Sequence, residues 1–302
     1  MADAVADSWV EVYAPYDAQP YLRLSRADRP IGTWLLWLPC LWAIFLAAGA
    51  TGWMFLDLWL ILGSGVGAFL MRGAGCTWND LQDRKIDAGV ARTANRPLPA
   101  GEVSPRAALA WLVVQALTAF LILITFNETA IWLGVLSLLP VAVYPFAKRF
   151  TWWPQVFLGI AFNWGALLLW AAHTGSIGLA PLLLYAAGIA WTLHYDTIYA
   201  HQDREDDALI GVKSTARLFG ERTAEWLWGF TLATGVLSAA AVWAADGGVI
   251  GYAGALGLAL HMASQIRRLD IADPPRCLLL FRETRWGGIG LAAALFLDSI
   301  FG

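Results

Sequence analysis

Two short acidic segments hold the residues best suited to chemistry in this 302-residue chain. The first acidic motif, residues 79–87 ("NDLQDRKID"), places Asn79, Asp83 and Asp87 four positions apart, with Asp80 three positions before Asp83. Side chains three and four positions apart lie on one face of a helix. The motif therefore predicts a ladder of carboxylates, whose mutual repulsion must be offset by basic side chains such as Arg84 and Lys85 or by a ligand.

The second acidic motif, residues 195–207 ("YDTIYAHQDREDD"), repeats this pattern. Asp196, Tyr199 and Asp203 are spaced i, i+3 and i+7, and Asp207 follows one turn later. On a continuous helix these side chains also form one stripe. The repetition indicates a shared ligand, because solvated helix ends with ordinary salt bridges would explain neither the repetition nor the placement of the two motifs.

A divalent cation is the ligand that fits these oxygens. Mg²⁺ usually binds through one or two carboxylates together with substrate phosphates. Two stripes predict two or more Mg²⁺ ions around a diphosphate, with these residues as ligands: Asn79, Asp80, Asp83, Asp87, Asp196, Asp203 and Asp207. Nearby basic residues are predicted to contact phosphate oxygens that the metal leaves uncovered: Arg92, Arg96, Lys148 and Lys213. The alternative for these four is an ordinary excess of Lys and Arg in loops.

The elements that position these motifs are predicted to be membrane-spanning helices. The chain is 59% hydrophobic and 14% charged, whereas soluble domains contain about 25% charged residues. A spanning helix needs about 20 apolar residues, and the sequence predicts an all-α bundle of nine. The expected spans are 31–50, 57–78, 107–127, 129–147, 152–172, 176–195, 225–245, 248–266 and 286–301. The three Cys have no CxxC spacing and indicate neither a disulfide framework nor a zinc site.

Lys and Arg gather in alternate loops between these spans and therefore on one side of the membrane, which predicts the orientation. The N-terminus and both acidic motifs are expected on the cytoplasmic side and the C-terminus on the other. Residues 1–20 form an acidic segment without a recognisable signal or transit peptide and are expected to be a flexible tail. Residues 21–302 are expected to form a single domain in a bacterial inner membrane.

The paired motifs resemble those of a known family. "NDLQDRKID" with "RTANRPLPAG", and "YDTIYAHQDREDDALIGVKSTA", resemble the two aspartate-rich motifs of the UbiA superfamily of membrane prenyltransferases. "RLSRADRPIGTWLLWLPCLWA" and "YPFAKRFTWWPQVFLG" resemble the branch that acts on 4-hydroxybenzoate. The resemblance implies Mg²⁺-dependent transfer of a polyprenyl chain from polyprenyl diphosphate to 4-hydroxybenzoate, ortho to the hydroxyl, in ubiquinone biosynthesis.

The residues suit that chemistry. Breaking the allylic C–O bond places negative charge on diphosphate, which metal and basic side chains stabilise. The allylic cation must be kept from water, and the ring of Tyr199 is an aromatic face for it. The expected catalytic residues are Asp80, Asp83, Asp196, Tyr199 and Asp203. Two roles stay open for an aspartate such as Asp196: to polarise the phenol or to accept the ring proton.

Arg72 is the expected partner of the acceptor carboxylate. It is the one basic residue inside an expected span, seven positions before Asn79 and about 10 Å deeper on the same helical face. Ionisable groups inside membranes are usually functional, although a structural pairing is the alternative. Arg26 is a second candidate. His194 and His261 are expected to be packing or lining residues.

Two further readings compete. A related enzyme could use another aromatic or ring-containing acceptor. A cation transporter would also use acidic side chains, but transport requires polar groups across the bilayer, and six of the nine expected spans contain no Asp, Glu, Lys or Arg.

Overall fold

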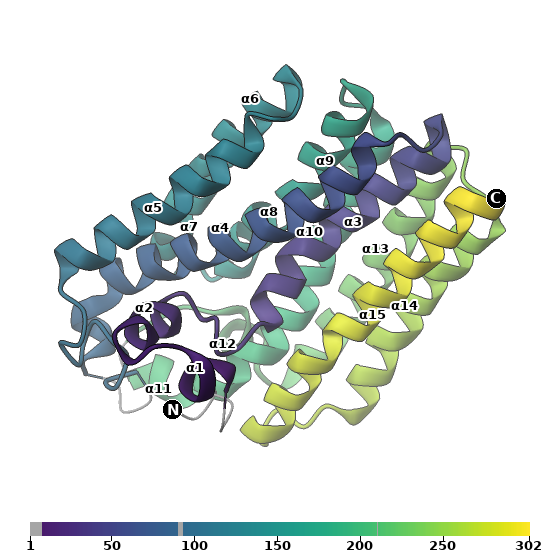
Figure 1. The fold of residues 1–302 in the computed structure, drawn as a ribbon. Helices are drawn as coiled ribbons and strands as arrows, with labels where there is room; N and C mark the ends of the chain where they lie inside the picture. Colours follow the sequence, from purple (N-terminus) through teal and green to yellow (C-terminus); the bar gives the residue numbers. More distant parts are fainter. Residues whose placement is uncertain (1–7, 90–92, 210) are drawn as a thin grey trace. The chain divides into compact units, whose positions relative to one another are not determined.

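The computed structural model describes residues 8–89, 93–209 and 211–302. Regular structure in this part of the chain is entirely helical (Figure 1). The chain divides into two compact units, one of residues 1–34 and 65–125, the other of residues 35–64 and 126–302.

The first unit is built on a long helix that carries the first acidic motif. It contains α1 (Trp9–Tyr13), η1 (Tyr16–Ala18), α2 (Gln19–Leu24), most of α4 (Leu56–Asp87) and α5 (Pro105–Leu123). With 32 residues, α4 is about 48 Å long at 1.5 Å per residue, well beyond the roughly 30 Å of a bilayer core. The prediction that the helix continues through residues 79–87 is confirmed.

Apolar packing and a helix cap hold the ends of this unit. Leu24, Leu98, Val103 and Ala108 form its buried cluster. The helix α5 begins after Ser104, whose side chain accepts the Ala107 N–H, and has proline at its first position.

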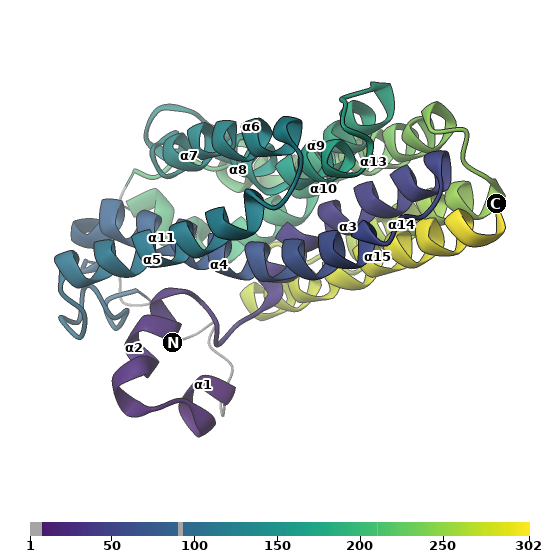
Figure 2. The same cartoon turned by 45° about the horizontal axis from the view of Figure 1, so that its top comes forward.

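The second unit surrounds α10 (Leu179–Ala200), which packs against α8 (Pro154–Phe162), α9 (Trp164–Thr174), α13 (Thr223–Ala244) and α15 (Pro274–Phe301). The remaining elements are most of α3 (Ile31–Thr51), α6 (Glu128–Leu136), α7 (Leu138–Phe150), η2 (His201–Asp203), α11 (Arg204–Leu209), α12 (Thr215–Phe219), η3 (Gly220–Arg222) and α14 (Val249–Arg268). Figures 1 and 2 both show α14 and α15 side by side.

The centre of the second unit is a close contact of two tryptophans. The Trp42 and Trp191 rings lie 4.9 Å apart, and the Trp42 Nε1–H donates to the Gly288 carbonyl at 2.9 Å. A Cβ at Gly288 would meet the Trp191 ring at 3.0 Å. The absence of a side chain at Gly288 therefore allows α15 to approach α10 closely.

Two expected spans are each divided into two helices. The first divides at Ser137, between α6 and α7. Pro140 lacks the N–H that would bond to the Leu136 carbonyl, so one helical hydrogen bond is missing at this break. The second divides at Asn163, between α8 and α9, where the Asn163 side chain donates to the Gly159 carbonyl at 2.8 Å.

The expected nine spans are only partly confirmed. By length and apolarity, seven helices in the described part of the chain can cross a membrane. They cover Ile31–Thr51, Leu56–Arg84, Pro105–Leu123, Glu128–Phe150, Pro154–Thr174, Thr215–Ala244 and Val249–Arg268. The expected spans 176–195 and 286–301 fall on α10 and α15, which are not among them. The last turns of α10 carry the start of the second acidic motif, and the first half of α15 carries four charged side chains: Arg276, Arg282, Glu283 and Arg285.

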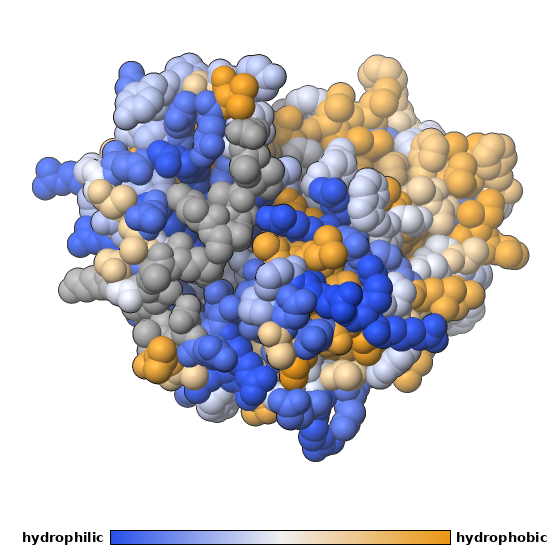
Figure 3. All heavy atoms as spheres, turned by 90° about the horizontal axis from the view of Figure 1, so that it is seen from below, coloured by the Kyte–Doolittle hydropathy of each residue, from blue (hydrophilic) through white to orange (hydrophobic). Residues whose placement is uncertain are grey.

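Basic residues in the second unit gather at one end of its helices. Arg267 and Arg268 end α14, and Arg276 lies in the first turn of α15. Figure 3 looks at the end where α14 turns into α15 and shows hydrophilic side chains over much of it. Within this unit the segregation of charge agrees with the loop pattern of the sequence.

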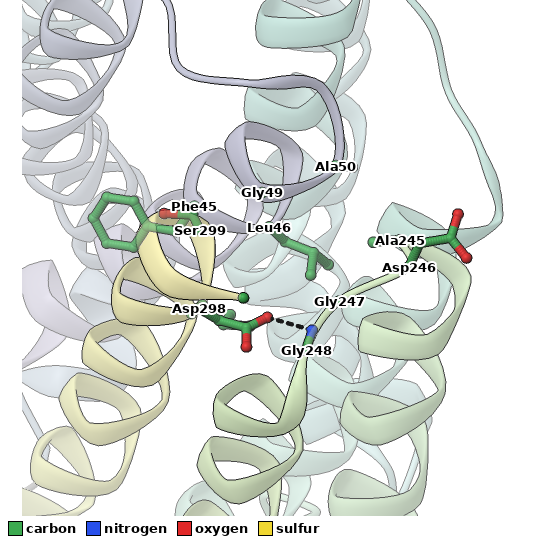
Figure 4. Close-up of a pocket in the computed structure, with 12 residues that line it drawn as sticks. Phe45, Leu46, Gly49, Ala50, Ala245, Asp246, Gly247, Gly248, Asp298 and Ser299 are labelled. Atoms are coloured by element: carbon green, nitrogen blue, oxygen red, sulfur yellow. Dashed lines mark hydrogen bonds between the residues drawn. The ribbon is translucent and has the colours of Figure 1, made fainter.

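The opposite end of the second unit is fastened by two buried carboxylates. Asp57 Oδ1 lies 2.6 Å from His173 Nδ1, whose Nε2 lies 2.8 Å from the Thr51 hydroxyl. Asp298 accepts the Gly248 N–H at 2.8 Å and the Gly251 N–H at 3.0 Å, which caps the first turn of α14 (Figure 4). The hollow beside Asp298 has a volume of about 30 Å³, enough for about one water molecule and too small for a substrate.

Candidate active site

The carboxylates of the first acidic motif lie buried on one face of α4. The Asp80 and Asp83 side chains are fully buried, and Asp87 is buried as well. Burial raises the pKa of Asp87, the nearby Arg96 lowers it, and the Asp80 and Asp83 charges raise it further. The three carboxylates therefore interact electrostatically, as the i, i+3 and i+4 spacing predicts.

Arg26 holds Asp80 in a buried ion pair. Its Nη2 lies 2.7 Å and 2.8 Å from the two oxygens of Asp80, and its Nη1 donates to the Arg23 and Leu24 carbonyls at 3.1 Å and 3.3 Å. The Arg26 backbone has φ = 58°, a left-handed conformation that is uncommon outside glycine. Such strain persists where surrounding contacts enforce it and is frequent at functional sites.

Arg96 bridges two carboxylates of the same motif. Its Nη1 lies 3.3 Å from Asp80 Oδ1 and 2.9 Å from Asp87 Oδ2. The hydroxyl of Thr93 donates to the Asp87 carbonyl at 2.8 Å, which fastens the Arg96 loop to the end of α4. The prediction for Arg92 lies outside the described residues.

The first motif has the donor chemistry for Mg²⁺ without a closed cage of ligands. In the described part of the chain, no three His, Cys, Asp or Glu side chains are arranged to hold a metal ion. At the first motif, guanidinium nitrogens of Arg26 and Arg96 contact oxygens of Asp80 and Asp87. Mg²⁺ usually takes only one or two protein carboxylates and completes its shell with phosphates and water, so the donor set fits this ion.

Arg72 lies in α4 with its guanidinium against Gly32. A Cβ at position 32 would collide with the guanidinium, so this glycine leaves room for Arg72. Arg72 and Asn79 are both half-buried. The sequence expectation that Arg72 binds the acceptor stays a prediction. So does the second candidate, Arg26, whose guanidinium pairs with Asp80.

The second acidic motif does not lie on one continuous α-helix, which corrects the sequence expectation. Asp196 and Tyr199 lie on α10, Asp203 lies in the 3₁₀ turn η2, and Asp207 lies on α11. The Tyr199 ring packs against the Phe281 ring at 4.5 Å. The change from 3.6 to three residues per turn rotates Asp203 away from an ideal stripe.

Neutral hydrogen bonds hold the second motif in place. The hydroxyls of Thr197 and Thr215 lie 2.7 Å apart, and His201 Nε2 lies 3.1 Å from the Thr223 hydroxyl. Burial is the main cause that lowers the pKa of His201 to about 4, and the positive charge of the nearby Arg204 is the second. His201 is therefore neutral at pH 7, and Ile198 beside it is fully buried in an apolar cluster with α13, α14 and α15.

A hydrogen bond joins the backbones of Lys148 and Lys213. The Lys213 N–H donates to the Lys148 carbonyl at 3.1 Å, and the Lys213 ammonium lies 3.4 Å from the Phe150 carbonyl. The Val212 N–H donates to the Asp207 carbonyl at 2.9 Å, which joins this loop to the end of the second motif. The structure thus brings Lys148, Lys213 and Asp207 into one region of the second unit.

A buried polar chain below the second motif was not predicted. Asn163 is fully buried and donates to the Thr192 hydroxyl at 2.8 Å, and Thr192 donates to the Tyr195 hydroxyl at 3.1 Å. Thr192 lies one helical turn before Asp196 on the same face of α10. The signal was present in the sequence, since Asn163 is a polar residue in the middle of an apolar span.

Several curated proteins are similar to this chain over nearly its whole length. The mitochondrial 4-hydroxybenzoate polyprenyltransferase of Rattus norvegicus is 48% identical over 291 residues, covering 95% of this chain and 77% of the relative. The enzyme of the same name from Homo sapiens is 48% identical over 303 residues, covering 99% and 79%. That of Arabidopsis thaliana is 43% identical, covering 97% and 72%.

Two solved structures share the fold. The apo structure of a UbiA homolog from Aeropyrum pernix K1 has a TM-score of 0.73 at 26% identity and covers 88% of this chain and 97% of that chain. A UbiA homolog from Archaeoglobus fulgidus bound to GPP and Mg²⁺ has a TM-score of 0.66 at 21% identity, covering 92% and 99%. At that identity the second likeness supports the fold alone.

The relatives correct one expectation from the sequence. The prediction of a bacterial inner membrane is contradicted, because the curated relatives are named as mitochondrial enzymes and come from eukaryotes. They point to a mitochondrial membrane, and the predicted cytoplasmic orientation of the motifs no longer applies.

The family assignment rests on two independent matches. A profile of the UbiA prenyltransferase family matches residues 36–289, which include both acidic motifs. The curated relatives extend the similarity beyond those limits at almost half identity. This chain therefore belongs to the UbiA prenyltransferase family.

Proposed function

We propose that this protein transfers a polyprenyl chain from polyprenyl diphosphate to the ring of 4-hydroxybenzoate, a step of ubiquinone biosynthesis. The observation that carries the proposal is the similarity of about 48% to enzymes of that name over most of both chains. The buried carboxylates and the arginines beside them suit a substrate that carries a diphosphate.

The metal is part of this proposal. Mg²⁺ supplies neutralisation of the charge that develops on the leaving diphosphate. Asn79, Asp83 and Asp87 of the first unit would hold it, and Asp196, Asp203 and Asp207 are the corresponding oxygen ligands of the second unit. Carboxylate and amide oxygens are hard ligands, which supports this choice of ion.

The remaining roles fall to other side chains of the chain. Arg96, Lys148 and Lys213 contact the diphosphate, and Arg72 binds the carboxylate of the acceptor. The Tyr199 ring faces the allylic cation, and an aspartate of the second motif receives the proton lost from the ring. The apolar helices keep water from the cation.

Product formation by membranes that contain the protein tests this function. The membranes are incubated with 4-hydroxybenzoate, Mg²⁺ and prenyl diphosphates of several lengths, and the prenylated acid is measured by mass spectrometry. The matched controls are membranes with the Asp83→Asn protein and reactions with homogentisate as acceptor. Product from homogentisate alone would indicate a sister enzyme, and no product from either acceptor would contradict the proposed function.

In this proposal α10 and α15, which are not among the seven long apolar helices, also cross the membrane. The chain then has nine spans. If α10 crosses, the turn before it and the loop after it lie on opposite sides. Ser176→Cys and Glu221→Cys place a thiol at each end, and the three native cysteines are buried. An impermeant maleimide should label only one of the two in sealed vesicles. Labelling of both from the same side would exclude a crossing by α10.

A further inference from the structure

Two arginines hold the first acidic motif in different ways. The guanidinium of Arg26 bonds four oxygens, two of Asp80 and two of backbone carbonyls. The side chain of Arg26 is 9% exposed, and that of its partner Asp80 is 0% exposed. Arg96 reaches Asp80 and Asp87 through the single nitrogen Nη1, and its side chain is 16% exposed. Arg26 is therefore fixed, whereas Arg96 can turn away at much smaller cost.

The two contacts also differ in the oxygens that they use. Asp87 Oδ2 lies 2.9 Å from Arg96 Nη1, and a divalent cation on that oxygen would lie too close to the guanidinium charge. Both oxygens of Asp80 are bound by Arg26. Removal of Arg26 would leave a buried carboxylate without its counter-charge, which is strongly unfavourable.

We propose that Arg96 is an exchangeable counter-ion, which leaves Asp87 for the diphosphate when a divalent cation binds that carboxylate, while Arg26 remains on Asp80. This inference rests on the proposed function. It removes Asp80 from the expected metal ligands and makes it the fixed partner of Arg26. The cation displaces Arg96 from Asp87 and so frees Arg96 for the diphosphate. The diphosphate draws Arg96 away and so frees Asp87 for the cation. Each ligand therefore favours the binding of the other.

The exchange predicts a result that needs no turnover. Mn²⁺ serves as the probe, and its binding to the purified full-length protein in detergent is followed by electron paramagnetic resonance. Arg96→Gln should bind Mn²⁺ about tenfold more tightly than the wild type in the absence of diphosphate, a coupling of ordinary size. Arg106→Gln removes the same charge from the first turn of α5 in the same unit and should leave the affinity unchanged.

Inorganic diphosphate supplies the second arm of the experiment. It should tighten Mn²⁺ binding more in the wild type than in Arg96→Gln, because only in the wild type can diphosphate draw Arg96 away from Asp87. Arg96→Lys keeps the charge but cannot bridge two carboxylates as a guanidinium does, and should give an intermediate Mn²⁺ affinity. Thermal unfolding of each variant confirms that it is folded before titration.

The outcomes separate this proposal from the proposed function. Equal Mn²⁺ affinity in wild type and Arg96→Gln overturns the exchange and leaves the metal requirement intact. An equal gain in Arg106→Gln overturns it too, because net charge would then explain the effect. Absence of Mn²⁺ binding in every protein, with and without diphosphate, overturns the exchange together with the proposed metal requirement.

Discussion

The two acidic motifs carry the same kind of side chain, but the protein positions them by different forces. The first lies on an unbroken helix, and charged contacts from Arg26 and Arg96 offset the repulsion between its carboxylates. The second lies on α10, a 3₁₀ turn and α11. Hydroxyl and imidazole hydrogen bonds and an apolar cluster fasten it to neighbouring helices.

The difference shows how carboxylates can be kept near an apolar region. An ion pair neutralises them directly but must be opened wherever a ligand uses the same oxygen. At the second motif, hydrogen bonds and apolar packing of neighbouring residues fix the backbone that carries the carboxylates. The two motifs should therefore respond differently to the removal of their supports.

The largest effects are expected from removing one support of each motif. Arg26→Gln leaves Asp80 buried without its partner, a loss of about 3–5 kcal/mol. Ile198→Ala opens a cavity in the buried cluster, a loss of about 2–5 kcal/mol. Hydrogen exchange should then increase at residues 79–87 in the first variant and at residues 195–207 in the second. The same pattern in both variants would show that the motifs are not supported independently.

Removing one carboxylate from each motif tests whether both are needed for turnover. Asp83→Ala and Asp203→Ala should each lower kcat at least about 100-fold, because each removes stabilisation of the developing charge on diphosphate. Asp246→Asn, at the other end of the second unit, is the control and should retain activity. A large loss in only one motif would assign the metal to that motif alone, and full activity in excess chelator would argue against a metal at either.

Arg72 and Arg96 lie in the same unit and are expected to serve different substrates. Arg72→Ala should raise the KM for 4-hydroxybenzoate about tenfold and leave that for prenyl diphosphate nearly unchanged, because a bidentate guanidinium orients a carboxylate. Arg72→Lys should recover part of the loss. Arg96→Ala should show the reverse pattern. If Arg72→Ala leaves both KM values unchanged but unfolds at lower temperature, Arg72 is a structural residue.

The smallest effect concerns acid. The lowered pKa of His201, about 4 against an ordinary 6.5, means that the unfolded chain binds a proton more readily than the folded one. The contribution of His201 to stability is therefore complete above pH 6.5 and is lost as the pH falls toward 4. The raised pKa of Asp87 acts in the opposite direction. The unfolding temperature of His201→Gln should fall less steeply than that of the wild type between these pH values, and identical slopes would contradict the assignment.

The sequence predicted the features that depend on local periodicity. The first motif lies on a helix because nothing between residues 56 and 87 interrupts it. The break at Ser137 was also readable from Pro140. The end of α10 at Ala200 was not predicted. Thr197 and His201, on either side of it, bond to Thr215 and Thr223, and such tertiary partners are not visible in local periodicity. The Arg26–Asp80 pair joins residues 54 positions apart, and spacing alone cannot indicate such a partner.

Asp298 has a consequence for the synthesis of the chain. The N-terminal donors of α14 at Gly248 and Gly251 are satisfied by a carboxylate that follows them by 50 and 47 residues. At roughly 5–20 residues per second, translation needs several seconds to reach it. During that interval the start of α14 must find its acceptors in water, in lipid headgroups or in the insertion machinery. The turn between α13 and α14 thus reaches its final form only when the last helix has been made.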